Sequence, residues 1–271
     1  MHQLPIDNDV VLKLCGRKPT IHRMLQDAEI PIPLYEEFEL DSIDRAYNFL
    51  TRSNGLVVVK PIDGYSAFGV TTHISKPSQL RSAAVNAALH SPKLMIEEQI
   101  AGECFRLLVY KKNLIHAVKR TGFRIDGDGK HSIRELIEKR GFGKKIFTDI
   151  SFTLAAQGIR YSDVPASNEN ILISSVGCGF NGGAELRTVY DDVVTSLVSD
   201  EIRADVERCA SIVDSDFLGV DIITCDITKD LRATGGVVNE INTTPALHHH
   251  YDYPQERYPP FLKDILKDLM R

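Results

Sequence analysis

Apolar residues alternate with polar ones along some stretches of the chain and recur at helical spacing along others. β-Branched and aromatic residues predict strands at 56–60, 70–74, 94–98 and 217–224, and a hairpin formed by 105–110 and 114–119. Apolar positions three or four residues apart predict helices at 20–28, 42–50, 78–89, 133–139, 193–211 and 261–270, and 149–158 is a further helical candidate. Ser132 and Glu135 form a capping-box pattern before the helix at 133–139. The pattern therefore indicates a protein that mixes helices with sheet and contains an antiparallel hairpin.

The composition is that of an ordinary globular protein. A chain of 271 residues, 43% of them hydrophobic, can build one large domain or two smaller lobes. The net charge of -5 leaves no general basic surface for a nucleic-acid backbone, so nucleic acid is not an expected partner. No apolar run approaches the roughly 20 residues of a membrane span, and the N-terminus lacks a secretory signal pattern. With five widely spaced cysteines and no C-x-x-C pair, the chain is expected to be cytoplasmic with reduced thiols.

Three hard oxygen ligands lie on two neighbouring apolar segments near the end of the chain. Asp221 follows Gly219-Val220, and Glu240 and Asn242 flank Ile241 in a segment that begins at Gly235. A strand's period of two puts Glu240 and Asn242 on one face, where Asp221 could join them around one cation. Mg²⁺ favours one or two carboxylates together with phosphate oxygens. The alternative is a solvated outer face of an antiparallel hairpin, on which alternating polar residues are routine.

A lysine and a glycine-containing loop form a second candidate for phosphate binding. Lys60 ends a run of three valines, and Gly64 and Gly69 lie in the loop that follows. Glycines allow phosphates to approach the backbone, and an ammonium neutralises their charge. The lysine precedes the glycines, so this is not a Walker loop. An ordinary strand–turn–strand with a surface lysine is the alternative.

The segment after the 94–98 strand carries groups suited to a nucleoside. Main-chain groups of Glu97, Glu98, Gln99 and Ile100 could pair with the edge of an adenine, and Glu103 could accept from ribose hydroxyls; a solvent-exposed strand end is the alternative. On the hairpin that follows, Arg106, Lys119 and Arg120 could neutralise phosphates or remain surface cations.

In this order the segments resemble the ATP-grasp family, specifically the ATP-grasp region of cyanophycin synthetases and of glutathione-synthetase-like carboxylate–amine ligases. The likeness runs from about Lys18 to about His250. It is carried by Arg17-Lys18, Ile30–Pro33, Val57–Pro61, Asp63-Gly64, Gly69-Val70, Glu97–Glu103, Phe105-Arg106, Gly127–Ile133, Asn181–Gly183, Asp221 and Glu240–Asn242.

The resemblance implies the ATP-grasp fold, in which two α+β lobes with mainly antiparallel sheets close on ATP. Lys18 and Lys60 would meet the phosphates, Glu97 to Ile100 the adenine and Glu103 the ribose. Asp221, Glu240 and Asn242 would hold magnesium, with two ions expected. Arg106 and Arg120 would face the transferring phosphate or the substrate carboxylate, with Lys60 a third catalytic cation, and Asn181 would line the acceptor side.

The same resemblance predicts the organisation of the chain. Residues 1–17 form a lead segment, 18–98 the small lobe with the phosphate-binding lysines and glycine loop, and 99–271 the large lobe with the magnesium and substrate side. The separate N-terminal domain that relatives commonly carry is not expected here. A homodimer or a partner protein could supply its contacts.

The implied activity is ATP-dependent ligation of a carboxylate to an amine through an acyl phosphate, on an amino acid, peptide or related small metabolite. An ATP-grasp kinase for a small molecule and a non-catalytic nucleotide-binding subunit are the alternatives. Pro245 is followed by Ala246, Leu247 and the run His248-His249-His250, where relatives often have Pro-Gly and then Arg, so the carboxylate and the amine stay open. Those histidines could face substrate, belong to an ordinary loop or, less readily, bind a metal.

Overall fold

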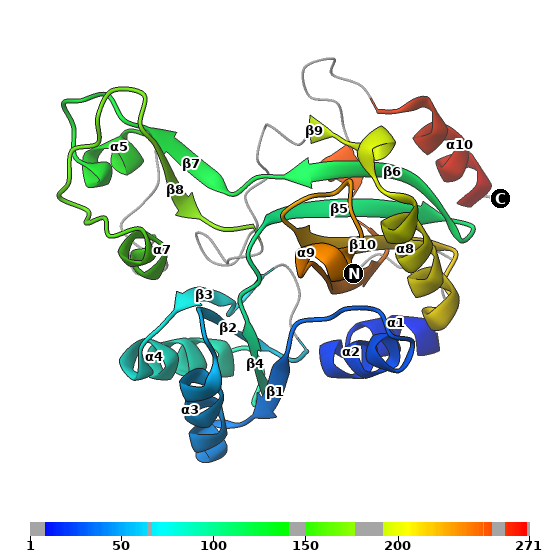
Figure 1. The fold of residues 1–271 in the computed structure, drawn as a ribbon, viewed down its shortest axis with the longest axis horizontal. Helices are drawn as coiled ribbons and strands as arrows, with labels where there is room; N and C mark the ends of the chain where they lie inside the picture. Colours follow the sequence, from blue (N-terminus) through cyan, green and yellow to red (C-terminus); the bar gives the residue numbers. More distant parts are fainter. Residues whose placement is uncertain are drawn as a thin grey trace. The chain divides into compact units, whose positions relative to one another are not determined.

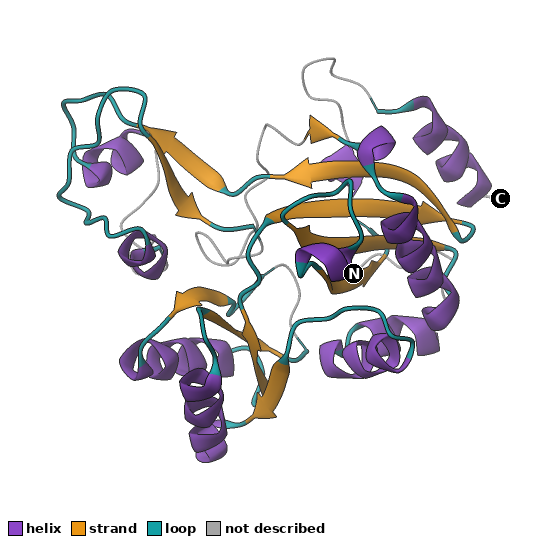
Figure 2. Cartoon of the chain, viewed as in Figure 1, coloured by secondary structure: helices purple, strands orange, loops and turns teal. Residues whose placement is uncertain are grey.

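The structure, a computed structural model, describes residues 9–63, 67–140, 150–176, 192–245, 247–250 and 258–269 (Figure 1). The chain forms two compact units, each assembled from separate segments. The first unit comprises Met1–Pro33, Ile100–Thr121 and Arg187–Arg271, and the second comprises Leu34–Gln99 and Gly122–Leu186. Each unit combines helices with antiparallel sheet, as the coloured ribbon in Figure 2 shows.

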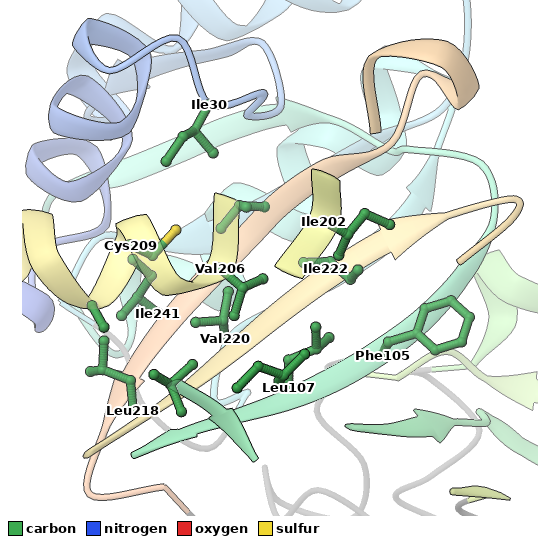
Figure 3. Packing of buried hydrophobic residues seen from close by; sticks show 14 of the residues in the cluster. Ile30, Phe105, Leu107, Ile202, Val206, Cys209, Leu218, Val220, Ile222 and Ile241 are labelled. Atoms are coloured by element: carbon green, nitrogen blue, oxygen red, sulfur yellow. The ribbon is translucent and has the colours of Figure 1, made fainter. Parts of the chain in front are cut away.

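The first unit is built on a sheet to which the described residues contribute five strands, in the order β11-β10-β5-β6-β9. These strands are β5 (Glu103–Tyr110), β6 (Asn113–Arg120), β9 (Asp192–Val193), β10 (Phe217–Thr224) and β11 (Val237–Thr243). Helix α8 (Asp200–Val213) covers one face, where Leu107, Val220 and Ile222 pack under Val206 and Cys209 (Figure 3). Alternate residues of the same strands therefore point to the other face.

Shorter helices complete the first unit. They are α1 (Asp9–Cys15), α2 (Lys18–Asp27), the 3-10 turn η2 (Thr195–Leu197), α9 (Leu231–Thr234), η3 (Leu247–His250) and α10 (Pro260–Leu269). Arg232 of α9 connects this helix to α8 and to the end of α2. Its guanidinium donates to Asp205 on α8 at 2.6 Å and to the Glu29 carbonyl after α2 at 2.6 Å. On the sheet face opposite α8, Leu262 and Ile265 of α10 pack with Leu108 and Phe217.

The second unit contains a four-stranded sheet in the order β1-β4-β2-β3. Its strands are β1 (Tyr35–Phe38), β2 (Val57–Pro61), β3 (Thr71–Ile74) and β4 (Leu94–Glu98), and its helices are η1 (Leu40–Ser42), α3 (Ile43–Arg52) and α4 (Pro77–Ala88). Phe49, Leu80 and Ile96 belong to one buried apolar cluster between these helices and the sheet.

A second part of this unit is the hairpin of β7 (Phe123–Asp126) and β8 (Asn170–Ser174) with helices α5 (Ile133–Lys139) and α7 (Ser151–Ala156). It has its own small core around Ile125, Ile137 and Ile171. Helix α7 joins the two parts, because Phe152 packs against the core of the four-stranded sheet.

The observed units differ from the predicted lobes 18–98 and 99–271. Helix α2 packs with the large sheet of the first unit, not with the small one, and residues 122–186 group with 34–99. The predicted helix at 193–211 begins too early, since residues 192–199 form β9, η2 and the cap Ser199, whose hydroxyl accepts from Ile202 N. Strand β1, the β7–β8 hairpin and α1 were not predicted.

Among the described residues no helix is long and apolar enough to cross a membrane. Four of the five cysteines lie in the described ranges, and no disulfide joins them: Cys15 and Cys209 are buried, Cys104 is half-buried and Cys225 is exposed. Cys178 lies outside those ranges.

Candidate active site

Asp221 lies at the centre of a charged cluster on the sheet face opposite α8. Its neighbours along β10, Val220 and Ile222, are directed into the core, which leaves the Asp221 side chain on the other face. Asp221 pairs directly with Arg106 on β5 and with Glu240 on β11. Residues that pair across neighbouring strands project to the same side, so the three form one row across the sheet.

Both carboxylate oxygens of Asp221 accept hydrogen bonds from Arg106. Nε of Arg106 donates to Oδ1 in a very short contact, and Nη2 donates to Oδ2 at 2.8 Å. The two side chains are buried, with Asp221 8% and Arg106 6% exposed. A fork-shaped guanidinium matches a carboxylate in this two-point way, which fixes both direction and distance.

Gly219 leaves the room that Arg106 occupies. A Cβ at Gly219 would lie 3.0 Å from Arg106 Nη1 and 3.1 Å from Arg106 Cδ. It would also lie 3.0 Å from Cβ of Pro245, which follows β11. Gly219 was named from the sequence but assigned no role. A glycine inside an apolar strand could have indicated one, because it commonly marks close approach by another group.

Two further predicted residues reach the same carboxylate. Arg120 Nη1 lies 3.5 Å from Asp221 Oδ1, and Asn242 Nδ2 donates to Asp221 Oδ2 at 3.1 Å. Asn242 pairs with Gly219 across the β10–β11 ladder, one row from Asp221. The structure thus brings together four residues that the sequence singled out: Arg106, Arg120, Asp221 and Asn242.

Lys18 and Glu240 form the edge of this cluster. Lys18 is the first residue of α2, and its Nζ lies 3.5 Å from Oε1 of Glu240. Pro19 in the first helical turn favours the start of the helix at this point. One turn later His22 is buried, with Nε2 3.2 Å from the Asn239 carbonyl of β11. The helix therefore holds Lys18 beside the strand that carries Glu240 and Asn242.

The donor set of this cluster fits a magnesium ion. Asp221 and Glu240 carry carboxylate oxygens at directly paired positions, and Asn242 carries an amide on the same face. No group of three or more His, Cys, Asp or Glu side chains able to hold a metal occurs in the described ranges.

In the second unit, Lys60 and Glu97 form a buried ion pair. Lys60 lies on β2, Glu97 lies on the adjacent strand β4, and the distance between Nζ and Oε1 is 2.6 Å. Only 6% and 4% of these side chains are exposed. Two predicted ATP residues are thus in direct contact, and a lysine so placed is not the surface cation of the alternative prediction.

The end of β4 is held by main-chain hydrogen bonds. Glu98 N donates to the Leu34 carbonyl and Gln99 N to the Leu56 carbonyl, at 3.0 and 2.9 Å. The Gln99 side chain accepts from His73 N at 2.6 Å, so its amide is used within the protein. Ile100, the next residue, belongs to the first unit.

The remaining predicted residues have varied settings. Gly69 has φ 72°, and a Cβ there would lie 2.7 Å from the His90 ring, so glycine suits its place. Glu103 begins β5 and pairs with Lys119 at 3.3 Å, with half of its side chain exposed. Gly64 and Asn181 lie outside the described residues.

The cysteine on this face of the sheet does not suit nucleophilic chemistry. Burial raises the pKa of Cys104 to about 12, despite the nearby Arg120 guanidinium that lowers it. The neutral thiol therefore dominates at neutral pH, and a thiol is a far weaker nucleophile than a thiolate.

The histidine run after Asn242 packs in part into the interior. His250 is 1% exposed, and its Nδ1 lies 2.9 Å from Nδ1 of His116 on β6. His116 in turn stacks at a tilt against Phe261 of α10. His249 is also buried, and the side chain of His248 lies outside the described residues. His250 therefore belongs to a packed cluster, and does not match the substrate-facing role considered for it.

Comparison with curated proteins finds cyanophycin synthetases and glutathione biosynthesis proteins among the relatives. The chain is 28% identical over 262 residues to a cyanophycin synthetase of Crocosphaera subtropica, which covers 89% of this chain and 29% of the relative. It is 26% identical over 278 residues to the glutathione biosynthesis bifunctional protein GshAB of Listeria welshimeri, covering 96% of this chain and 35% of the relative. The chain thus spans about a third of the length of these relatives. No protein-family model matches it.

Comparison with solved structures shows the fold. A D-alanine–D-alanine ligase from Bacillus anthracis superposes with a TM-score of 0.60 at 15% identity, covering 97% of this chain and 70% of that one. The ATP-grasp ligase PsnB, in complex with a precursor peptide and AMPPNP, gives a TM-score of 0.56 at 14% identity, covering 98% and 61%. At this identity the likeness concerns the fold alone.

Proposed function

We propose that this chain, which has the ATP-grasp fold and resembles the ATP-grasp region of carboxylate–amine ligases, is an ATP- and magnesium-dependent ligase of that type. It would activate a carboxylate as an acyl phosphate and pass the acyl group to an amine, forming an amide or peptide bond. The carboxylate and the amine would come from an amino acid, a peptide or a related small metabolite.

The row Arg106–Asp221–Glu240, with Lys18 beside it, is the observation that carries this proposal. It gathers cations for phosphate oxygens and hard oxygen donors for magnesium on one sheet face of an ATP-grasp fold. Phosphoryl transfer needs little covalent participation by the protein, because positioning and charge neutralisation supply most of the acceleration. The chemistry requires no nucleophile from the described residues of the row.

The predicted site residues of the first unit each have a role in the proposed reaction. Asp221, Glu240 and Asn242 would hold magnesium, which when bound offsets the charge on the phosphate oxygens. Lys18 would bind phosphate oxygens, and Arg106 and Arg120 would orient the transferring phosphate or the substrate carboxylate through two-point hydrogen bonds. Glu103 would accept from ribose hydroxyls.

In the second unit the proposed roles concern the nucleotide. Lys60 would bind phosphate oxygens, and its partner Glu97 would hold that ammonium in place. Glu97 to Gln99, with Ile100 of the first unit, would pair with adenine. Gly64 and Gly69 would let phosphates approach the loop backbone. Asn181 stays a candidate for the acceptor side.

Trapping of the acyl group tests the proposal. The protein would be incubated with ATP, Mg²⁺, hydroxylamine and a panel of amino-acid and peptide carboxylates, and both ADP and hydroxamate would be measured. We expect hydroxamate with at least one carboxylate, in step with ADP. A stable phosphorylated product that needs no amine would indicate a kinase instead. Nucleotide binding without ADP release across the panel would indicate a non-catalytic subunit.

Asp221→Asn is the matching variant, because it keeps the size of the side chain and removes its charge. We expect hydroxamate formation to fall at least about a hundredfold, since the asparagine no longer offers a carboxylate to Mg²⁺. Asp205→Asn is a suitable control: Asp205 is another buried, arginine-paired aspartate of the same unit, on α8. Full activity of Asp221→Asn would refute this assignment of the metal site.

A further inference from the structure

Each predicted acid of the first unit's site is paired with a predicted cation. Arg106 engages Asp221, Lys18 engages Glu240, and Lys119 engages Glu103. The Asp221 pair differs from the other two because it is buried and two-pointed, whereas Glu240 and Glu103 are partly exposed to solvent. The Glu240 side chain is 33% exposed, so water can solvate its carboxylate when Lys18 is displaced. If Arg106 leaves the buried Asp221 carboxylate, another positive charge must take its place.

A cation and Arg106 need the same oxygens. Arg106 donates to both Oδ1 and Oδ2, and Arg120 and Asn242 add contacts to one oxygen each. A carboxylate offers about four lone-pair sites. Mg²⁺ requires close, nearly octahedral coordination, which a guanidinium lying over both oxygens would obstruct. Binding of the ion at Asp221 therefore requires Arg106 to move.

Asn242 would also have to change its contact with Asp221. Its Nδ2 donates to Asp221 Oδ2, so the amide presents its donor end to the carboxylate. A metal ligand must present the amide oxygen. The amide would have to turn over for Asn242 to join Asp221 around an ion, and its hydrogen bond to Asp221 would then be lost.

We infer that Arg106 is the resident counter-ion of Asp221 and that Mg²⁺ enters the site by exchange with it. This inference rests on the proposed magnesium role of Asp221. Once displaced, the guanidinium can turn its two-point face toward an anion, so cation binding and presentation of Arg106 to a phosphate or carboxylate are one event. Arg106 thus lowers the affinity of the protein for a bare cation, because the ion must compete for a carboxylate that is mostly engaged.

Direct binding of Mn²⁺ tests the exchange without turnover. The 271-residue chain would be titrated with Mn²⁺ alone, and free Mn²⁺ would be followed by electron paramagnetic resonance. We expect weak binding to the wild type and at least about tenfold tighter binding to Arg106→Gln, because glutamine cannot hold both oxygens of Asp221. Arg106→Lys, a point charge without the fork, should be intermediate. Adding Asp221→Asn to Arg106→Gln should abolish the gain.

Arg232→Gln is the matched control. Arg232 also engages a buried aspartate of the first unit, Asp205, but on α8 and not in the site. It should not change Mn²⁺ affinity. If Arg106→Gln is too unstable for titration, Mn²⁺ should raise its midpoint of thermal unfolding more than that of Arg232→Gln, and Arg106→Lys supplies a second titration.

Equal Mn²⁺ affinity of wild type, Arg106→Lys and Arg106→Gln would overturn the exchange. So would a gain that survives Asp221→Asn, since the ion would then bind elsewhere. These outcomes are separable from the ligase proposal. Hydroxamate formation by the wild type without any Mn²⁺ gain would refute the exchange alone, whereas the gain without hydroxamate would refute the ligase alone.

Discussion

Gly219 is the position where a single methyl group would reach the charged cluster. Its Cβ would meet Arg106 Nη1 and Pro245 Cβ, each at 3.0 Å, and the strand backbone there is compatible with alanine. Gly219→Ala should therefore act by crowding and not by backbone strain. We expect a loss of about 1–3 kcal/mol in the free energy of unfolding. Hydroxamate formation should fall by more than tenfold, because the methyl group takes the space in which the Arg106 side chain lies in the site.

Gly55→Ala is the control for this change. Gly55 lies in the turn before β2, and a Cβ there would have no neighbour within 4 Å. Urea unfolding and hydroxamate assays on both variants would be compared with the wild type. Unchanged activity of Gly219→Ala, with Gly55→Ala also unchanged, would show that the cluster adapts to the methyl group and that Arg106 does not need the space beside Gly219.

His116 should make the protein less stable in mild acid. Burial lowers the pKa of His116 to about 4. Its ring faces His250 and Phe261 in the packed end of the sheet. Between pH 6.5 and 4 the unfolded chain binds a proton here that the folded chain does not, so stability falls as the pH falls through this window and is constant above it. Since one pKa unit is worth about 1.4 kcal/mol, the loss is at most about 3 kcal/mol.

A comparison with His116→Gln isolates this contribution from that of other groups. Glutamine does not titrate and can still hydrogen-bond to His250. The free energy of unfolding would be measured for both proteins at pH 7 and at pH 4. The advantage of the wild type should shrink toward pH 4, and an advantage of the same size at both values would contradict the neutral, buried state of His116.

At the scale of single elements, the sequence predicted those helices and strands that local interactions, such as capping and turn formation, determine. The capping box of Ser132 and Glu135 is present, and α5 spans 133–139 as expected. The β5–β6 hairpin follows from two arms of β-forming residues joined by a short polar turn. Strand β1 was missed because it is four residues long and carries two acids, and its existence depends on pairing with β4. Tertiary pairing outweighs propensity in such a strand.

The start of α8 shows how a cap overrides periodicity. The apolar positions from Val193 to Val198 continue the helical spacing, yet the chain forms a short strand and a 3-10 turn there. Ser199 then begins the helix, and Asp200 and Glu201 in its first turn favour that end electrostatically. Hydrophobic spacing alone could not distinguish Val194 and Val198, which join the core from irregular backbone, from helical residues.

In the candidate site, too, some contacts follow from local sequence patterns and others depend on long-range pairing. The period of two predicts that Glu240 and Asn242 share a face, and the connection through α9 brings β11 back beside β10, with Asp221 opposite Glu240. The pairing of Arg106 with Asp221 spans 115 residues along the chain. A local sequence pattern cannot relate residues so far apart in the chain. The two residues were grouped by the resemblance to the ATP-grasp family and not by periodicity. The role of Gly219 depends on a side chain from another strand and became visible only with the structure.

At the scale of the whole molecule, the chain order of the segments is not the order of the units. The first unit takes segments from the beginning, middle and end of the chain, and the second takes two segments from between them. The predicted lobes were continuous ranges, and no continuous range can describe such units. Helix α2 illustrates the reason: it precedes the small sheet in sequence, but its Ile21 and Leu25 are buried in the core of the large sheet.

Residues 34–99 are the continuous segment with a sheet and core of their own, and we expect them to fold when expressed alone. They contain β1 to β4, α3 and α4, and Phe49, Leu80 and Ile96 fill their core without help from the first unit. Stability should be marginal, about 3–5 kcal/mol at most, because a fragment of this size has one small core. It also loses the packing of Phe152 and the contact between His73 and Thr153.

The segment 100–186 is the matched comparison, and it should not unfold cooperatively. It carries β5 and β6 without β10 and α8, so the apolar face around Leu107 is left uncovered. Amide chemical-shift dispersion and urea unfolding would be measured for both fragments. A disordered 34–99 fragment would mean that α7 and the β7–β8 hairpin are required for the small sheet, and adding residues 122–176 to it through a flexible linker should then restore the fold.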